Sequence, residues 1–205
     1  MKIIFATANK GKLREAGEIL GNGWELVSPA EMGITEDIEK TGETLKDNSL
    51  LKATCIHEKT GLDCFADDTG LEVDALGGAP GVHTARYAGE GHDFQANMDK
   101  LLAELGDSPS RTARFRSVVT LILDGKAFFF DGRLEGRIAF SKSGNGGFGY
   151  DPVFIPDELP SNDGSLVPNT DNLTLADIPE EDKNAISHRG KALRMMAAFL
   201  KEREK

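Results

Sequence analysis

The first half of the chain alternates short apolar runs with amphipathic segments. Ile3 to Ala6 is a run typical of a buried strand, and apolar positions then recur at helical spacing over residues 13–20. A second strand is predicted at 24–27. A helix is predicted from about 45 to 59, because Thr44 opens a capping-box pattern there. This order of strands and helices is typical of an α/β fold.

An apolar stretch from 62 to 66 leads directly into Asp67 and Asp68. A strand pattern resumes at 71–75, so the two acids are expected at a strand end. Unpaired acids are too costly to bury, so they must face a cleft, a cation or a donor. Neighbouring residues of an extended chain point to opposite faces, so one acid can bind metal or water while the other braces the turn. The alternative is a turn in which Asp side chains bond the local backbone.

The hydrophobic period changes in the second half of the chain. Asp93 is expected to cap a helix whose apolar face runs over 94–105. Asp124-Gly125 is a strong hairpin signal within a predicted series of strands at 113–123, 126–130 and 134–139. A β-meander in an α/β chain indicates a second lobe, at about 113–155, or a mixed sheet with an antiparallel extension.

The end of the chain combines a polar stretch with a closing helix. Residues 157–172 are rich in turn formers and predict a long exposed insertion. Ser187 is the expected N-cap of the last helix, whose first turn holds His188 and Arg189. Cations are disfavoured at the positive end of a helix dipole, so this pair indicates a ligand site. The alternative is two surface residues whose charges solvent screens.

The net charge of −10 over 205 residues argues against general nucleic-acid binding, which needs a basic surface. A polyanionic small substrate would have to be held by local lysines and a divalent ion. Cys55 and Cys64 have no spacing typical of a zinc site or a disulfide framework, which fits a reducing cytoplasm. The sequence shows no signal-peptide pattern and no apolar run near the roughly 20 residues that cross a bilayer. We therefore expect a cytoplasmic protein without a membrane role.

Two glycine-containing loops are candidate ligand sites. Residues 7–12, TANKGK, place two lysines where backbone N–H groups and a helix dipole favour a phosphate, although the Walker pattern is absent. Residues 144–152, GNGGFGYDP, let the backbone approach a flat ligand, and Phe148 and Tyr150 offer rings for stacking. The alternatives are a solvated helix start and a mobile surface loop. Lys52 lies on the inward face of its predicted helix, where its stem either passes the core or its charge reaches the cleft.

Five motifs span nearly the whole chain: TANKGKLREA, ETLKDNSLLKA, ADDTGLEVDALGGAPGVHTARYAG, GGFGYDPVF and KNAISHRGKAL. In this order they resemble the inosine triphosphate pyrophosphatase family. The resemblance implies one domain over 1–205 with an elongated, two-lobed α/β fold, a central mixed sheet flanked by helices, and a nucleotide cleft between the lobes. It also implies a homodimer and Mg²⁺-dependent cleavage of a small-molecule substrate, ITP, dITP or XTP, to the monophosphate and pyrophosphate.

The same resemblance implies roles for individual residues. Glu39 and Asp68 resemble the metal ligands, and Asp68 also resembles the catalytic proton acceptor, while Lys52 would stabilise charge that develops on phosphorus. Thr69 would touch the substrate. The phosphate loop would be Thr7, Ala8, Asn9, Lys10, Gly11 and Lys12. The base pocket would be formed by Phe148, Gly149, Tyr150, Asp151, Lys183, His188 and Arg189. Donors that face the 6-oxo group would select the purine, because adenine's amino group would leave a donor unpaired.

Two other functions remain as alternatives. Another Mg²⁺-dependent phosphohydrolase, such as a haloacid-dehalogenase-like phosphatase, also has an acid after an apolar strand, but that class needs an Asp-x-Asp pair. A non-catalytic nucleotide sensor would keep the phosphate loop and the base pocket without needing the metal acids. The first would release orthophosphate as its primary product, and the second would bind without turnover.

Overall fold

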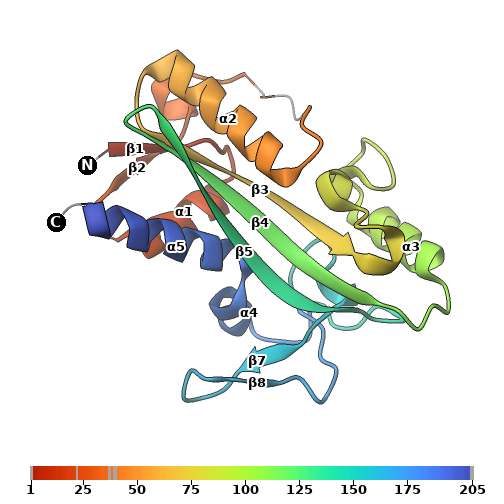
Figure 1. Cartoon of the computed structure of the whole chain (residues 1–205). Coiled ribbons are helices and arrows are strands. Elements are labelled where there is room, and N and C mark those ends of the chain that lie inside the picture. The colour runs from red at the N-terminus through yellow and green to blue at the C-terminus, as the bar shows by residue number, and fades with distance from the viewer. Residues whose placement is uncertain (1, 22, 37, 39–40, 204–205) are drawn as a thin grey trace. The chain divides into compact units, whose positions relative to one another are not determined.

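The computed structural model describes residues 2–21, 23–36, 38 and 41–203 and has an α/β fold (Figure 1). Its main sheet has the order β2-β1-β3-β4-β5-β6. The strands are β1 (Lys2–Phe5), β2 (Glu25–Val27), β3 (Cys64–Val73), β4 (Thr112–Leu123), β5 (Lys126–Ile138) and β6 (Phe154–Pro156). Strand β1 runs parallel to β2 and β3, whereas β5 and β6 are antiparallel. The mixed sheet expected from the sequence is thus confirmed.

Four helices follow predicted amphipathic segments: α1 (Lys10–Leu20), α2 (Leu45–Thr60), α3 (Phe94–Leu105) and α5 (His188–Arg203). Helix α4 (Glu180–Ile186) was not predicted. Short 3₁₀ turns lie at η1 (Ala30–Met32), η2 (Asp74–Leu76), η3 (Gly81–Arg86) and η4 (Asp151–Val153). Thr44 and Asp93 cap α2 and α3 as predicted, because each side chain accepts a backbone N–H of the first turn. None of the helices within the described ranges is long and apolar enough to cross a membrane.

The chain divides into two compact units, each made of several segments. The first contains Met1–Thr69, Ser117–Gly132 and Arg189–Lys205, and the second contains Gly70–Arg116 and Arg133–His188. The lobe expected at 113–155 therefore shares residues with both units. Each unit has hydrophobic clusters of its own.

In the first unit, helices cover both faces of the strands (Figure 1). Ile3 and Phe5 point to the face covered by α1 and α5, and Ile4 points to the opposite face, covered by α2. This alternation follows from the two-residue period of a strand. The result is a three-layer arrangement in which every inward side chain of β1 is fully buried.

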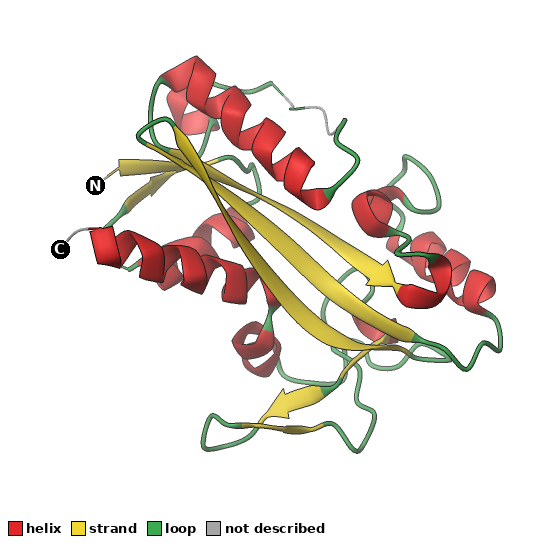
Figure 2. Ribbon diagram, viewed as in Figure 1, coloured by secondary structure: helices red, strands yellow, loops and turns green. Residues whose placement is uncertain are grey.

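Strand β3 differs from its sequence prediction, because it continues without a break through Asp67 and Asp68 (Figure 2). The acids were expected at a strand end. They lie instead in the middle of a ten-residue strand, with side chains 1% and 2% exposed. The strand tolerates them because cationic side chains reach both carboxylates. Strand β5 is likewise one strand where two were predicted.

The predicted long insertion at 157–172 is partly ordered. It forms a small antiparallel hairpin of β7 (Glu158–Pro160) and β8 (Leu166–Pro168). Asn169 is buried and holds the returning chain, since its amide donates to the carbonyls of Pro156 and Leu173. The composition of this segment predicts turns, but it does not predict these hydrogen bonds of Asn169. The Asp124-Gly125 hairpin is confirmed, with φ of 50° and 71° at its two residues.

Gly136 generates a stability prediction. A Cβ at this position would lie 2.3 Å from the Ile155 carbonyl oxygen and 2.8 Å from the Phe154 ring, so the β5–β6 pair would have to separate. We expect Gly136→Ala to lower the free energy of unfolding by about 1–3 kcal/mol, as overpacking does. Urea unfolding measures this change.

Gly17→Ala is the matched control. Gly17 lies inside α1 with open space around its Cβ position, so alanine should stabilise the protein by about 0.5–1 kcal/mol through helix propensity. Equal effects of the two substitutions would contradict the proposed close approach at Gly136.

Candidate functional site

The centre of the candidate site in the first unit is the carboxylate of Asp67. Lys12 Nζ lies 3.0 Å from Oδ1 and 2.7 Å from Oδ2, and Arg189 Nε lies 3.2 Å from Oδ2. Arg189 also donates through Nη1 to Glu15 Oε2 at 3.1 Å. Helix α1 supplies Lys12 and Glu15, one turn apart on the same face, and the start of α5 supplies Arg189.

Burial and these contacts together shift the pKa values of Asp67, Lys12 and Arg189. Burial alone would raise the pKa of Asp67, but the charges of Lys12, Arg189 and Lys52 outweigh it and hold the pKa well below its usual range. Burial lowers the pKa of Lys12 although Asp67 opposes this effect. Burial also acts to lower the pKa of Arg189, but Asp67 and Glu15 raise it overall. The cluster is therefore a set of ionised groups that depend on one another.

Asp68 has a separate partner. Lys52 Nζ lies 3.2 Å from Asp68 Oδ1 and also donates to the backbone carbonyl of Asp67. The carboxylates of the two neighbouring acids thus have different cationic partners, in agreement with the alternation of side chains along a strand. Lys52 points its charge to the acids, which decides between the two roles that the sequence left open for it.

A hollow of about 420 Å³ lies next to Lys52 in the first unit. Lys52, Thr7 and Ala8 line it together with residues of the segment 29–38, including Thr35 and Glu36. Its volume falls within the range of small-molecule sites. The structure therefore brings the start of the predicted phosphate loop and the predicted catalytic lysine to one cavity.

The rest of the phosphate loop is arranged differently from the prediction. Asn9 caps α1 and accepts the N–H groups of Gly11 and Lys12 at 2.9 and 3.2 Å. Those two donors were expected to be open to a phosphate, but a cap residue of this type satisfies them itself. Lys10 is exposed, and Lys12 turns inward to Asp67.

The remaining residues predicted for this group are Thr69 and Glu39. Thr69 Oγ1 donates to Ser117 Oγ at 3.0 Å, across from β3 to β4. Glu39 lies outside the described residues. Within the part of the chain that the structure describes, no group of three or more His, Cys, Asp or Glu side chains is placed to hold a metal ion.

A second cluster of predicted residues lies in the second unit. Asp151 is buried and accepts the backbone N–H of Phe148 at 2.8 Å, and it also pairs with Lys183. The Lys183 ammonium lies 4.4 Å from the centre of the Phe148 ring, which is 65% exposed. Gly147 is required here, because its φ is +72° and a Cβ would lie 2.2 Å from Asp151 Oδ2.

Other predicted base-pocket residues have different surroundings. Tyr150 was expected to offer a ring for stacking, but it is buried, and its hydroxyl donates to the Thr84 carbonyl at 2.9 Å. His188 stacks on Phe115 with ring centres 5.1 Å apart. Gly149 follows Phe148 with a φ of +64°. Arg189 was expected among these residues, but its described ion pairs are with Glu15 and Asp67 of the first unit.

The sequence analysis did not identify Glu15 as a site residue, although its helical spacing from Lys12 could have indicated it. Glu15 follows Lys12 by three residues on a predicted helix, so the two share a face. Ser117 and Phe115, the partners of Thr69 and His188, lie in a strand far along the chain, and no local pattern links them to those residues.

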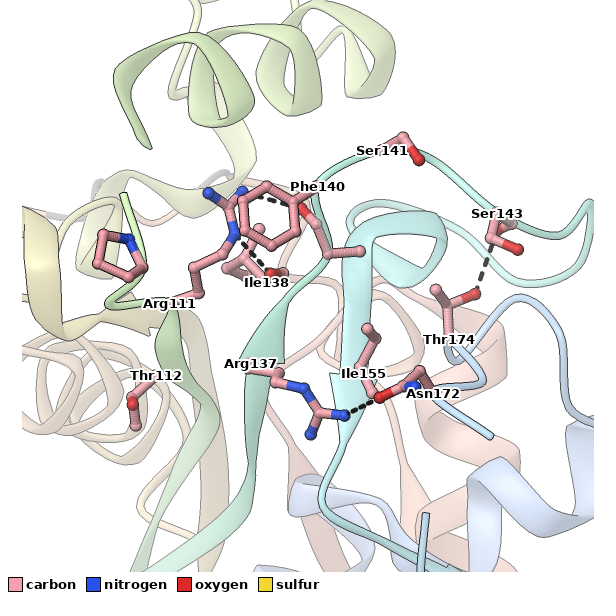
Figure 3. A pocket seen from close by; sticks show the side chains of 12 residues that line it. Arg111, Thr112, Arg137, Ile138, Phe140, Ser141, Ser143, Ile155, Asn172 and Thr174 are labelled. Carbon is pink, nitrogen blue, oxygen red and sulfur yellow. Dashed lines mark hydrogen bonds between the residues drawn. The ribbon is translucent and has the colours of Figure 1, made fainter. Parts of the chain in front are cut away.

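A further hollow of about 460 Å³ lies in the second unit, and none of the predicted site residues lines it (Figure 3). Arg111 donates to the carbonyls of Ile138 and Ala139, and its guanidinium lies 4.2 Å from the centre of the Phe140 ring. Arg137 donates to Asn172 in the same view. The two arginines therefore hold neighbouring chain segments together.

Comparison with known proteins identifies the family. The model of the Ham1 family matches residues 3–199. A dITP/XTP pyrophosphatase of Porphyromonas gingivalis is 50% identical over 200 residues, covering 97% of both chains. A protein of the same name from Bacillus subtilis is 42% identical over 201 residues, covering 96% of both.

A solved structure of a Ham1 protein has the same fold as this chain. The Staphylococcus aureus Ham1 protein superposes with a TM-score of 0.88 at 35% identity and covers 100% of both chains. The family expected from the five motifs is thereby confirmed. This chain belongs to the Ham1 family.

Proposed function

We propose that this protein hydrolyses the non-standard purine nucleoside triphosphates ITP, dITP and XTP to the monophosphate and pyrophosphate. The observation that carries the proposal is the buried carboxylate of Asp68 beside Lys52, whose side chain also lines the 420 Å³ hollow with Thr7 and Ala8. The names of the P. gingivalis and B. subtilis relatives support this substrate class.

The first unit provides the positive charge that a triphosphate needs in a protein of net charge −10. Lys52 and Lys12 are held by the carboxylates of β3 and require little reorganisation when an anion binds. We assign Lys52 to the charge that develops on the reacting phosphorus. We assign Lys12, with Thr7 and the exposed Lys10, to the remaining phosphate oxygens.

Asp68 is the group that accepts a proton. Water attacks the α-phosphorus, and the bond from that phosphorus to the oxygen bridging the α- and β-phosphates breaks, so that pyrophosphate leaves. Asp68 takes the proton that the water loses. Lys52 Nζ lies 3.2 Å from Asp68 Oδ1 and orients this carboxylate.

Asp68 and Glu39 are the proposed ligands of Mg²⁺. A carboxylate oxygen is the ligand that Mg²⁺ prefers, and the ion usually takes only one or two protein carboxylates when substrate phosphates are present, so this donor set fits. When bound, the ion would neutralise phosphate charge and polarise the reacting phosphoryl group.

Phe148 and Lys183 are the proposed contacts of the base. The exposed ring of Phe148 offers a stacking face, and the adjacent Lys183 ammonium is a donor suited to a 6-oxo oxygen. Asp151 holds both groups in place. Adenine presents an amino donor at that position and would offer Lys183 no acceptor on the base.

We also propose that the protein acts in the cytoplasm as a homodimer. Its two cysteines are both free, and Cys64 is buried with its thiol directed at the Ala53 carbonyl, which suits a reducing compartment. The homodimer is supported by the motif resemblance alone.

Asp68→Asn tests the proton acceptor. Asparagine is nearly isosteric and cannot take a proton, so kcat for ITP should fall by about 100-fold or more, the typical contribution of a general base. The assay separates pyrophosphate from orthophosphate and is paired with thermal unfolding to show that the variant is folded. Asp74→Asn, the same chemical change on an exposed residue of the second unit, should stay within twofold of wild type. Full activity of Asp68→Asn would remove this residue from the mechanism, and orthophosphate as first product would favour a phosphatase.

Lys183→Met tests the recognition of the base. Methionine keeps the length of the stem and loses the donor, so the ratio of kcat/KM for ITP to that for ATP should fall by about tenfold or more. Lys142→Met removes a lysine that pairs with Asp99 on the surface of the same unit and should leave the ratio unchanged. An unaltered ratio in Lys183→Met would exclude Lys183 from purine selection.

A further inference from the structure

Asp67 is a buried carboxylate that pairs with two cations. It is 1% exposed, and Lys12 and Arg189 together contact both of its oxygens at 2.7–3.2 Å. A carboxylate in this state has its charge compensated and its oxygens occupied by donors. Asp68, its neighbour, points to the other face of the strand and pairs with Lys52.

The pairing extends beyond Asp67 to Glu15. The side chains form a row of alternating charge, Glu15, Arg189, Asp67 and Lys12, whose adjacent members contact one another. Three separate elements contribute to it: α1, β3 and α5. The two positive and two negative charges cancel, so the row can be buried without a net charge.

The two cations of the row lie in motifs assigned to substrate binding, whereas the two carboxylates are turned toward those cations. We propose that Asp67 and Glu15 are positioning residues, which hold Lys12 and Arg189 in the geometry that receives the nucleotide substrate, and that Asp67 is not a metal ligand. This inference rests on the proposed function for its substrate.

The physical reason is preorganisation. Lysine and arginine have long flexible side chains, and an unheld cation would lose rotamer freedom each time a substrate binds. Carboxylates that fix these cations in the free protein remove that cost. Loss of a positioning carboxylate should therefore weaken substrate binding rather than metal binding.

A double-mutant cycle between Glu15 and Arg189 tests the proposal. Glu15→Gln should raise KM for ITP about tenfold, with kcat changed less, because a held cation contributes to binding. In the background of Arg189→Gln, Glu15→Gln should change KM for ITP by less than twofold, since Glu15 acts through Arg189. A tenfold effect in both backgrounds would overturn the positioning role.

Glu18→Gln is the matched control. Glu18 lies on the same helix, has a side chain 71% exposed, and pairs only loosely with Arg14 at 3.9 Å. It should leave KM within twofold of wild type. A tenfold change in this variant would show that any lost charge on α1 has the effect, and would contradict a specific role for Glu15.

Asp67→Asn tests the statement about metal. The Mg²⁺ concentration for half-maximal activity should stay within twofold of wild type while KM for ITP rises. A tenfold rise in that Mg²⁺ concentration, with KM unchanged at saturating Mg²⁺, would identify Asp67 as a metal ligand and overturn the inference. If Asp67→Asn fails to fold, the Glu15 cycle still decides whether the row positions its cations.

Crystal structures of the substrate-free variants separate this inference from the proposed function. Glu15→Gln should displace the Arg189 guanidinium, and Asp67→Asn should also displace the Lys12 ammonium. Unchanged positions of both cations would overturn the inference even if the enzyme hydrolyses ITP. Displaced cations in a protein whose wild type hydrolyses none of these nucleotides would instead count against the proposed function alone.

Discussion

Two carboxylates buried in the interior of one strand constrain the whole first unit. Asp67 and Asp68 are 1% and 2% exposed, and an ionised carboxylate is stable at such positions only when cations and donors replace water. Lys12 and Lys52 satisfy this requirement from opposite faces of β3. Helices α1 and α2 must therefore pack with these lysines directed at the strand, and the two faces of the sheet become chemically distinct.

The same requirement explains features that look unfavourable in isolation. Arg189 lies in the first turn of α5, where the helix dipole opposes a positive charge. Its ion pairs with Asp67 and Glu15 offset that cost and draw the start of α5 toward α1. Lys12 is similarly placed close to the start of α1. Two cations of the candidate site, Lys12 and Arg189, thus lie near helix starts, and both pair with the buried Asp67.

The second unit also contains a buried carboxylate that is paired with a lysine. Asp151 is buried, fixes the backbone N–H of Phe148 and pairs with Lys183, so that a glycine-rich loop acquires a defined shape. Tyr150 anchors the loop further through its hydroxyl bond to Thr84. The exposed Phe148 ring is thereby held on a rigid support, which a loop of this composition would otherwise lack.

The sequence alone predicted the α/β class, the helices α1, α2, α3 and α5, the caps Thr44 and Asp93, and the family, because hydrophobic periods, cap residues and motifs are local along the chain. It also predicted that Asp67 and Asp68 differ in role. The sequence analysis missed the local cap Asn9, which occupies two donors of the phosphate loop. Only the tertiary structure decided that β3 runs unbroken through both acids and that Arg189 pairs with Glu15 and Asp67. These outcomes depend on contacts between elements up to 174 residues apart, such as Glu15 with Arg189, for which local patterns hold no information.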